Sequence, residues 1–198
     1  MEAAIPIACE EDLLRARLYA FLSELLMRPP DGERLAGLGK LTGDDTELGR
    51  GIAALARVAA GTSAEAVERE YHELFIGIGR GELVPYGSYY LTGFLNEKPL
   101  ARLRQAMGEL GIERVPSVKE PEDHIGALME MMAGLITGTF ARPLPVAEQR
   151  EFFNAHVGSW AGYFFRDLEK ARASVLYAPV GTIGRVFMDI EAAAFAMD

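Results

Sequence analysis

The sequence predicts an all-α fold. Apolar residues recur three and four positions apart through most of the chain, and no alternation of period two is long enough for a sheet. With 198 residues, of which 49% are hydrophobic, the chain is long enough to bury a substantial core. We therefore expect one domain spanning residues 1–198, a helical bundle with a long ordered loop between its early and late helices.

The first half of the chain divides at proline, glycine and capping residues. Leu14, Leu18 and Leu25 share a helical face that ends at Pro29 and Pro30. Short helices are expected near residues 35–41 and 47–59. A capping box, Thr-Ser-Ala-Glu at residues 62–65, then starts a helix that ends at Gly77.

Residues 77–99 are rich in Gly, Pro and Tyr and predict an ordered loop, with one helical turn at residues 88–91. Loops of this length usually carry function or join subdomains. The same loop suits a hinge for helix exchange, so a monomer and a domain-swapped homodimer both remain open. Further helices are expected at residues 100–110, 121–137, 146–171 and 182–197.

The most informative stretch is Glu-Pro-Glu-Asp-His at residues 120–124, which precedes an apolar helical face running to Ile136. Proline is best tolerated at the first helical position, and acidic side chains there face the positive end of the helix dipole. Pro121 is therefore predicted to start the helix, with Glu122 facing solvent. The pentapeptide has two interpretations: a well-capped helix start, or a cluster that binds a ligand.

Composition limits the ligands. A net charge of −9 and a pI near 4.9 argue against nucleic acid and anionic membrane surfaces, and favour basic partners. The single cysteine, Cys9, forms no internal disulfide or zinc finger, which fits a reducing cytoplasm. We expect a cytoplasmic protein without membrane insertion, because neither a targeting signal nor about 18 continuous apolar residues are present.

Familiar enzyme motifs are incomplete. The glycines of residues 77–81 follow a helix rather than a strand, which argues against a nucleotide loop, and Ile76 stands where a zincin helix needs histidine. No serine lies in a nucleophile elbow. We predict no catalytic residue, cofactor or metal. The alternative is a small helical metal-binding protein or enzyme that uses Glu120, Asp123 and His124.

Three segments together resemble one known family. Tyr-His-Glu-Leu-Phe at residues 71–75, Pro-Tyr-Gly-Ser-Tyr-Tyr-Leu at 85–91 and Glu-Pro-Glu-Asp-His at 120–124 are similar to the TorD/DmsD/NarJ family of redox-enzyme maturation chaperones. His156, Val157 and Trp160 agree with a His-Leu-x-x-Trp segment of that family. The resemblance covers about residues 13–195; it departs from the family at Ile78, where relatives often carry Pro.

The resemblance implies an all-helical, non-enzymatic chaperone. Such a protein binds the twin-arginine signal peptide, or another segment, of a molybdenum- or tungsten-containing oxidoreductase subunit until its cofactor is loaded. Residues 89–95 are more similar to members associated with formate dehydrogenase. The family has also been linked to GTP, although nothing in this sequence indicates a phosphate site.

A receptor for such a leader needs carboxylates beside an apolar groove. Glu120 and Asp123 are expected to accept arginine, while His124 and the loop with Tyr86, Ser88 and Tyr89 shape the site. Apolar contact should set the affinity, and the acidic residues should select the leader. The peptide-binding residues predicted on a second segment, which either line the groove or belong to the core, are Tyr71, Leu74 and Phe75.

Overall fold

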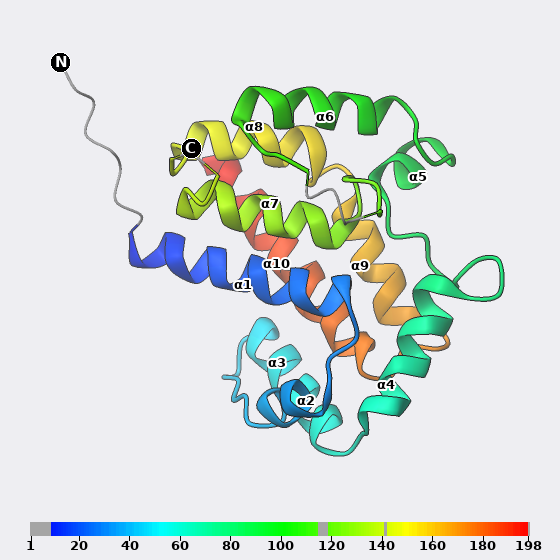
Figure 1. Cartoon of the computed structure of the whole chain (residues 1–198). Helices are drawn as coiled ribbons and strands as arrows, with labels where there is room; N and C mark the ends of the chain where they lie inside the picture. Colours follow the sequence, from blue (N-terminus) through cyan, green and yellow to red (C-terminus); the bar gives the residue numbers. More distant parts are fainter. Residues whose placement is uncertain (1–8, 115–118, 141, 198) are drawn as a thin grey trace. The chain divides into compact units, whose positions relative to one another are not determined.

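The computed structural model describes residues 9–114, 119–140 and 142–197, and its regular elements are all helical (Figure 1). None of these described residues lies in a β-strand; a single bridge pairs Tyr86 with His124. The all-α prediction is confirmed. The elements are α1 (Glu10–Met27), α2 (Gly32–Leu38), α3 (Glu47–Ala60), α4 (Ala64–Tyr71), the π-helical turn η1 (His72–Ile76), α5 (Gly87–Thr92), α6 (Lys98–Leu110), α7 (Ile125–Thr137), α8 (Val146–His156), α9 (Ala161–Lys170) and α10 (Tyr177–Met197).

The helices fall into two compact units, each built from separate stretches of the chain. The first unit contains the chain up to Met27 together with Tyr86–Ser159, and the second contains Arg28–Pro85 and Trp160–Met197. A single domain over residues 1–198 stays a prediction. None of the described helices is long and apolar enough to cross a membrane. Residues 1–8, on which the expected lack of a targeting signal also depends, lie outside the described residues.

In the first unit, α1 and α7 pack side by side, α8 packs against α6 and α7, and α5 packs against α6 (Figure 1). Helix α7 is buried around most of its circumference, which its apolar sequence permits. Met129 and Met132 are both fully buried on it and fill the interior. This unit contains the turn at residues 120–124.

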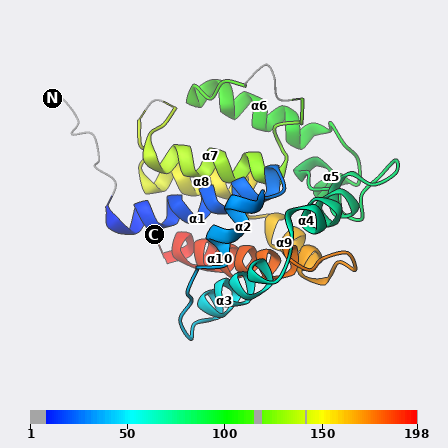
Figure 2. The same ribbon diagram turned by 60° about the horizontal axis from the view of Figure 1, so that its bottom comes forward.

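In the second unit, α3 and α9 both pack against α10, and α2 packs against α3 (Figure 2). Two glycines of α10 allow α9 to approach closely. A Cβ atom on Gly181 would lie 2.5 Å from the backbone nitrogen of Glu169, and one on Gly184 would lie 2.2 Å from the ring of Phe165. Side chains at these two positions would force the helices apart.

The start of α10 is held by a carboxylate from another helix. Glu70, buried on α4, accepts the backbone N–H groups of Val175 (2.7 Å), Leu176 (3.0 Å) and Tyr177 (2.8 Å). The first N–H groups of a helix have no partner within it, so this carboxylate supplies the missing acceptors. Helix α10 consequently begins at Tyr177 rather than at the predicted residue 182.

Two further boundaries differ from the prediction. The helix expected over residues 146–171 is broken between α8 and α9, because the N–H of Gly158 bonds to the carbonyl of Phe153 (2.7 Å) and Trp160 leaves the helical conformation to become the N-cap of α9. The helix expected from Pro121 begins instead at Ile125. The early helices are present as predicted, although α2 lies about three residues before the predicted 35–41. The Ser63 cap of α4 and the end at Gly77 are confirmed, and the last turn before Gly77 widens into η1.

Replacing the Glu70 carboxylate should destabilise the protein. Glu70→Gln keeps one oxygen acceptor and places an NH₂ group against a backbone donor, so we expect the free energy of unfolding to fall by about 2 kcal/mol. Urea denaturation measures the change. The matched control is Glu68→Gln on the exposed side of the same helix, expected within about 0.5 kcal/mol of the parent. Equal stabilities for the two variants would contradict the capping role.

Candidate functional site

Residues 120–124 form a turn that is pinned to the start of α5. The N–H of His124 bonds to the carbonyl of Pro121 (3.1 Å), which closes the turn. Asp123 then accepts two N–H groups: its carbonyl receives that of Gly87 (2.9 Å), and its carboxylate Oδ2 receives that of Ser88 (2.7 Å). Helix α5 has no side-chain cap of its own, so Asp123 provides one from 35 residues away.

His124 is the N-cap of α7. Its Nδ1 accepts the N–H of Gly126 (3.1 Å), and the side chain is buried. Burial lowers the pKa of His124 from its ordinary 6.5 to about 4, and the nearby charge of Glu120 opposes only part of that shift. The imidazole is therefore neutral near pH 7, as an acceptor for an N–H group must be.

Tyr86 joins the buried part of this turn to its surface. Its ring lies edge-on to His124, with centroids 5.2 Å apart, and its hydroxyl donates a hydrogen bond to the Glu120 carboxylate. Glu120 itself is exposed. A buried histidine thus orients a tyrosine, which in turn orients a surface carboxylate.

Glu122 does not face solvent, contrary to the prediction. It is buried and forms ion pairs with Arg104 (2.8 Å) and Arg114 (3.5 Å). Burial by itself raises the pKa of Glu122, but the hydrogen bond and charge of Arg104, with the charge of Arg114, outweigh burial and hold the pKa below its usual value. Because the chain's own arginines neutralise it, Glu122 is a poor acceptor for an external one.

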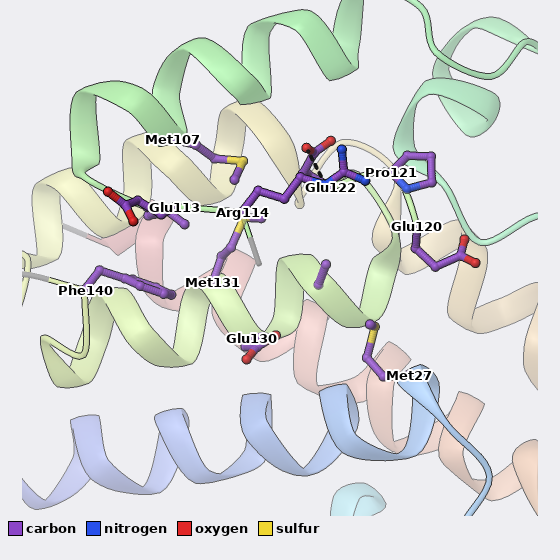
Figure 3. Close-up of a pocket in the computed structure, with 12 residues that line it drawn as sticks. Met27, Met107, Glu113, Arg114, Glu120, Pro121, Glu122, Glu130, Met131 and Phe140 are labelled. Carbon is purple, nitrogen blue, oxygen red and sulfur yellow. Dashed lines mark ion pairs between the residues drawn. The ribbon is translucent and has the colours of Figure 1, made fainter. Parts of the chain in front are cut away.

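A cavity of about 140 Å³ lies beside this turn, within the first unit (Figure 3). Its walls are mainly apolar, four carboxylates and one guanidinium border them, and the lining comes from α1, α6, α7 and the segments around them. The lining residues are Met27, Met107, Ile112, Glu113, Arg114, Glu120, Pro121, Glu122, Ala127, Glu130, Met131 and Phe140.

The predicted site residues are distributed unevenly around this cavity. Glu120 lines it, whereas Asp123 and His124 are buried in the adjoining turn and hold α5 and α7. Ser88 is fully buried and is held by Asp123. Tyr89 is half-buried, with its ring 6.2 Å from that of Tyr90. Direct peptide contact by these residues stays a prediction.

The remaining three predicted residues belong to the second unit. Leu74 is fully buried, as expected of a core position. Tyr71 and Phe75 are half-buried and pack edge-on against each other, with ring centroids 4.9 Å apart. Both rings also contact Tyr177 at the start of α10. The structure therefore places this segment in an aromatic cluster, and a role for it in peptide binding stays a prediction.

Several cavity residues are not evident from the sequence. Met27, Met107 and Phe140 come from three distant segments and carry no motif, and Glu113 and Glu130 are isolated acidic residues. Met131 was recognisable only as one of several methionines at helical spacing. These side chains come together only because α1, α6 and α7 pack around the cavity.

The metal-site alternative gains no support from the described residues. Across residues 9–114, 119–140 and 142–197, no group of three or more His, Cys, Asp or Glu side chains is placed to hold a metal ion. The three residues proposed for such a site have different partners: Tyr86 for Glu120, Ser88 for Asp123 and Gly126 for His124.

Comparison with known proteins places the chain in a family. A family model described as the nitrate reductase delta subunit matches residues 41–166. The chaperone protein TorD of Vibrio cholerae serotype O1 is 24% identical over 194 residues, covering 88% of each chain. TorD of Shewanella loihica is 23% identical over 203 residues, covering 91% of this chain and 92% of its own.

The fold has a counterpart among solved structures. A putative redox enzyme maturation protein from Archaeoglobus fulgidus superimposes with a TM-score of 0.58 at 22% identity, over 96% of this chain and 99% of its own. This likeness concerns the fold. Together with the family match, it confirms the resemblance to redox-enzyme maturation chaperones, and the chain belongs to the nitrate reductase delta subunit family. The formate-dehydrogenase subtype stays a prediction.

The neutral, buried His124 predicts a pH-dependent stability. Its folded pKa of about 4 lies below the ordinary 6.5, so the unfolded chain binds the proton first and the free energy of unfolding falls as pH drops between these values. The expected loss over this range is about 3 kcal/mol. Burial also lowers the pKa of His156, so both histidines contribute to the pH dependence of stability. A variant is therefore needed to measure the contribution of His124.

The His124→Asn variant isolates the contribution of His124 to the pH dependence of the free energy of unfolding. The asparagine side-chain oxygen can still accept the Gly126 N–H but does not titrate. Urea denaturation of both proteins at several pH values between 4 and 7 should show a shallower pH dependence for the variant. Identical slopes would contradict the assignment of this titration to His124.

Proposed function

We propose that this protein is a cytoplasmic, non-catalytic maturation chaperone. It binds the leader peptide, or another segment, of a molybdenum- or tungsten-containing oxidoreductase subunit in the cavity beside residues 120–124, and holds it while the cofactor is loaded. A formate dehydrogenase is the client we favour. The observation that carries the proposal is the combination, in one cavity, of methionine and phenylalanine walls with exposed carboxylates.

Family membership supports the chaperone part of this proposal. The relatives that match along most of the chain are named chaperones, and the structural counterpart is named a redox enzyme maturation protein. The client class comes from the resemblance of the three sequence segments, and the formate-dehydrogenase subtype comes from residues 89–95 alone.

The charge around the cavity suits a basic partner. His124 is neutral, so it does not offset the negative charge of Glu120. Glu122 is already paired with Arg104 and Arg114. The exposed carboxylates of the lining are therefore the available acceptors for a guanidinium group; they are Glu113, Glu120 and Glu130.

Apolar contacts and ion pairs should contribute very different free energies to binding. Burying about 400 Å² of apolar peptide surface at roughly 25 cal/mol per Å² gives about 10 kcal/mol, less some 2 to 5 kcal/mol for ordering the peptide. Each exposed arginine–carboxylate pair adds about 1 kcal/mol. Apolar contact thus sets the affinity, and the carboxylates determine which leader is accepted.

Isothermal titration calorimetry tests the proposal. A twin-arginine leader peptide should bind the pure protein, and its Lys-Lys variant should bind several-fold more weakly, because lysine lacks the bidentate geometry of arginine. Raising the salt concentration should weaken binding without abolishing it. Absence of binding by any leader would overturn the proposal, and metal analysis of the same sample checks the alternative of a metal protein.

Filling the cavity should reduce leader affinity. Ala127 lines the cavity from the first turn of α7 and is half-buried, so Ala127→Leu places extra side-chain volume where the peptide is proposed to bind. We expect affinity to fall by about tenfold or more, equivalent to at least about 1.4 kcal/mol.

The matched control is Ala133→Leu. Ala133 is also half-buried on α7 but lines a neighbouring groove with Leu13 and Ala16 of α1 rather than the cavity. It should leave the affinity within about twofold of the parent. Thermal melting verifies that both variants are folded. Equal losses of affinity in the two variants would place the binding site elsewhere.

A further inference from the structure

We propose that the cavity takes a single phenylalanine- or leucine-sized side chain of the client segment, and that Glu113 and Glu120 accept one basic residue on each side of it. This inference rests on the proposed function and specifies the kind of segment that is recognised. The sequence that fits is an apolar anchor between two basic residues, rather than a basic pair alone.

The volume of the cavity limits it to one anchor. An apolar cavity of about 150 Å³ in another protein holds one benzene molecule, and the cavity here measures about 140 Å³. One aromatic ring or one leucine side chain is therefore enough to fill it. The anchor is expected to be a single residue rather than a whole apolar helix face.

The walls can adapt to either anchor. Met27, Met107 and Met131 line the cavity on three different helices, α1, α6 and α7. Methionine is unbranched and polarizable, and it makes favourable contacts with aromatic rings. Phe140 closes another part of the lining. Such walls discriminate by size and apolarity and tolerate differences in the shape of the anchor.

Two of the three exposed carboxylates of the lining, Glu113 and Glu120, lie on opposite sides of the cavity in the view of Figure 3. In the view of Figure 3, Glu113 lies on the left of the lining and Glu120 on the right, with the Arg114–Glu122 ion pair between them. Both acceptors are exposed. Tyr86 fixes Glu120 through one carboxylate oxygen, Oε2, and a carboxylate has a second oxygen, Oε1, that can accept a further donor.

This arrangement distinguishes the occupant by charge. A segment with one basic residue before the anchor and one after it meets a carboxylate on each side. A second copy of this chain is disfavoured, because each copy carries a net charge of −9. The occupant is therefore a basic–apolar–basic peptide segment.

The first experiment locates the anchor. Methionine methyl groups of the full chain are labelled with ¹³C and observed by NMR while a synthetic peptide is added that carries one central phenylalanine and an arginine one helical turn before and after it. Ring-current shifts are expected at Met27, Met107 and Met131. Met129 and Met132, buried on α7 and outside the lining, are the internal references.

The outcomes separate this inference from the proposed function. Calorimetric binding with shifts at the three cavity methionines supports both. Binding without those shifts overturns the inference and leaves the chaperone proposal standing. If neither this peptide nor a twin-arginine leader binds, both fall. Replacing the central phenylalanine by alanine should weaken binding by about thirtyfold, and loss of less than about threefold would contradict a single anchor.

The second experiment tests the two ends separately. Glu113→Gln and Glu120→Gln should each weaken binding of the peptide that carries both arginines by about threefold. Each substitution should leave unchanged the binding of a peptide that lacks the arginine accepted by the substituted glutamate. Glu151→Gln, an exposed carboxylate on α8 outside the lining, is the control and should change nothing. Equal effects on all peptides would show general attraction by charge and overturn the assignment of one arginine to each end.

Discussion

The hydrogen bonds between Asp123 and the start of α5 are the constraint on which the candidate site depends. Through its carbonyl and its carboxylate, Asp123 accepts the N–H groups of Gly87 and Ser88, two donors that α5 cannot satisfy by itself. The loop and the turn are thereby held together, which sets Tyr86 against His124 and brings its hydroxyl to Glu120. The position of Glu120 in the cavity wall therefore depends on the capping of α5 by Asp123.

Within residues 120–124, burial distinguishes the residues that hold the structure together from the one that is accessible to a ligand. Asp123 and His124 are buried and engaged with backbone N–H groups, Glu122 is buried and paired with arginines, and Glu120 alone in this turn is exposed. These bonds engage Oδ2 of Asp123 and Nδ1 of His124, whereas the second Asp123 oxygen, Oδ1, is buried without a hydrogen-bond partner among the described residues. The second unit shows the same pattern at Glu70, which is buried and accepts the N–H groups at the start of α10 from its place on α4.

Three of the errors in the sequence prediction have a common physical origin. Local rules placed a helix start at Pro121, because proline and acidic residues favour the first turn, but pairing with residues 86–88 keeps residues 121–124 in a turn. Local rules also placed Glu122 in solvent, whereas Arg104 and Arg114 approach it from elsewhere in the first unit. The start of α10 was missed because its cap, Glu70, lies over 100 residues away. In each case the deciding partner lies outside the few residues that a local helix rule considers.

By itself the sequence determined the all-α class, most helix ends and the family, because apolar periodicity, capping residues and short motifs are local properties of the chain. It also identified Glu120 as a residue of interest. Only the tertiary structure decided that Glu120 borders a cavity, that Asp123 and His124 hold helices beside it, and that Met27, Met107 and Met131 form its walls. A cavity is made by side chains from separate helices, and their meeting depends on packing that no local pattern records.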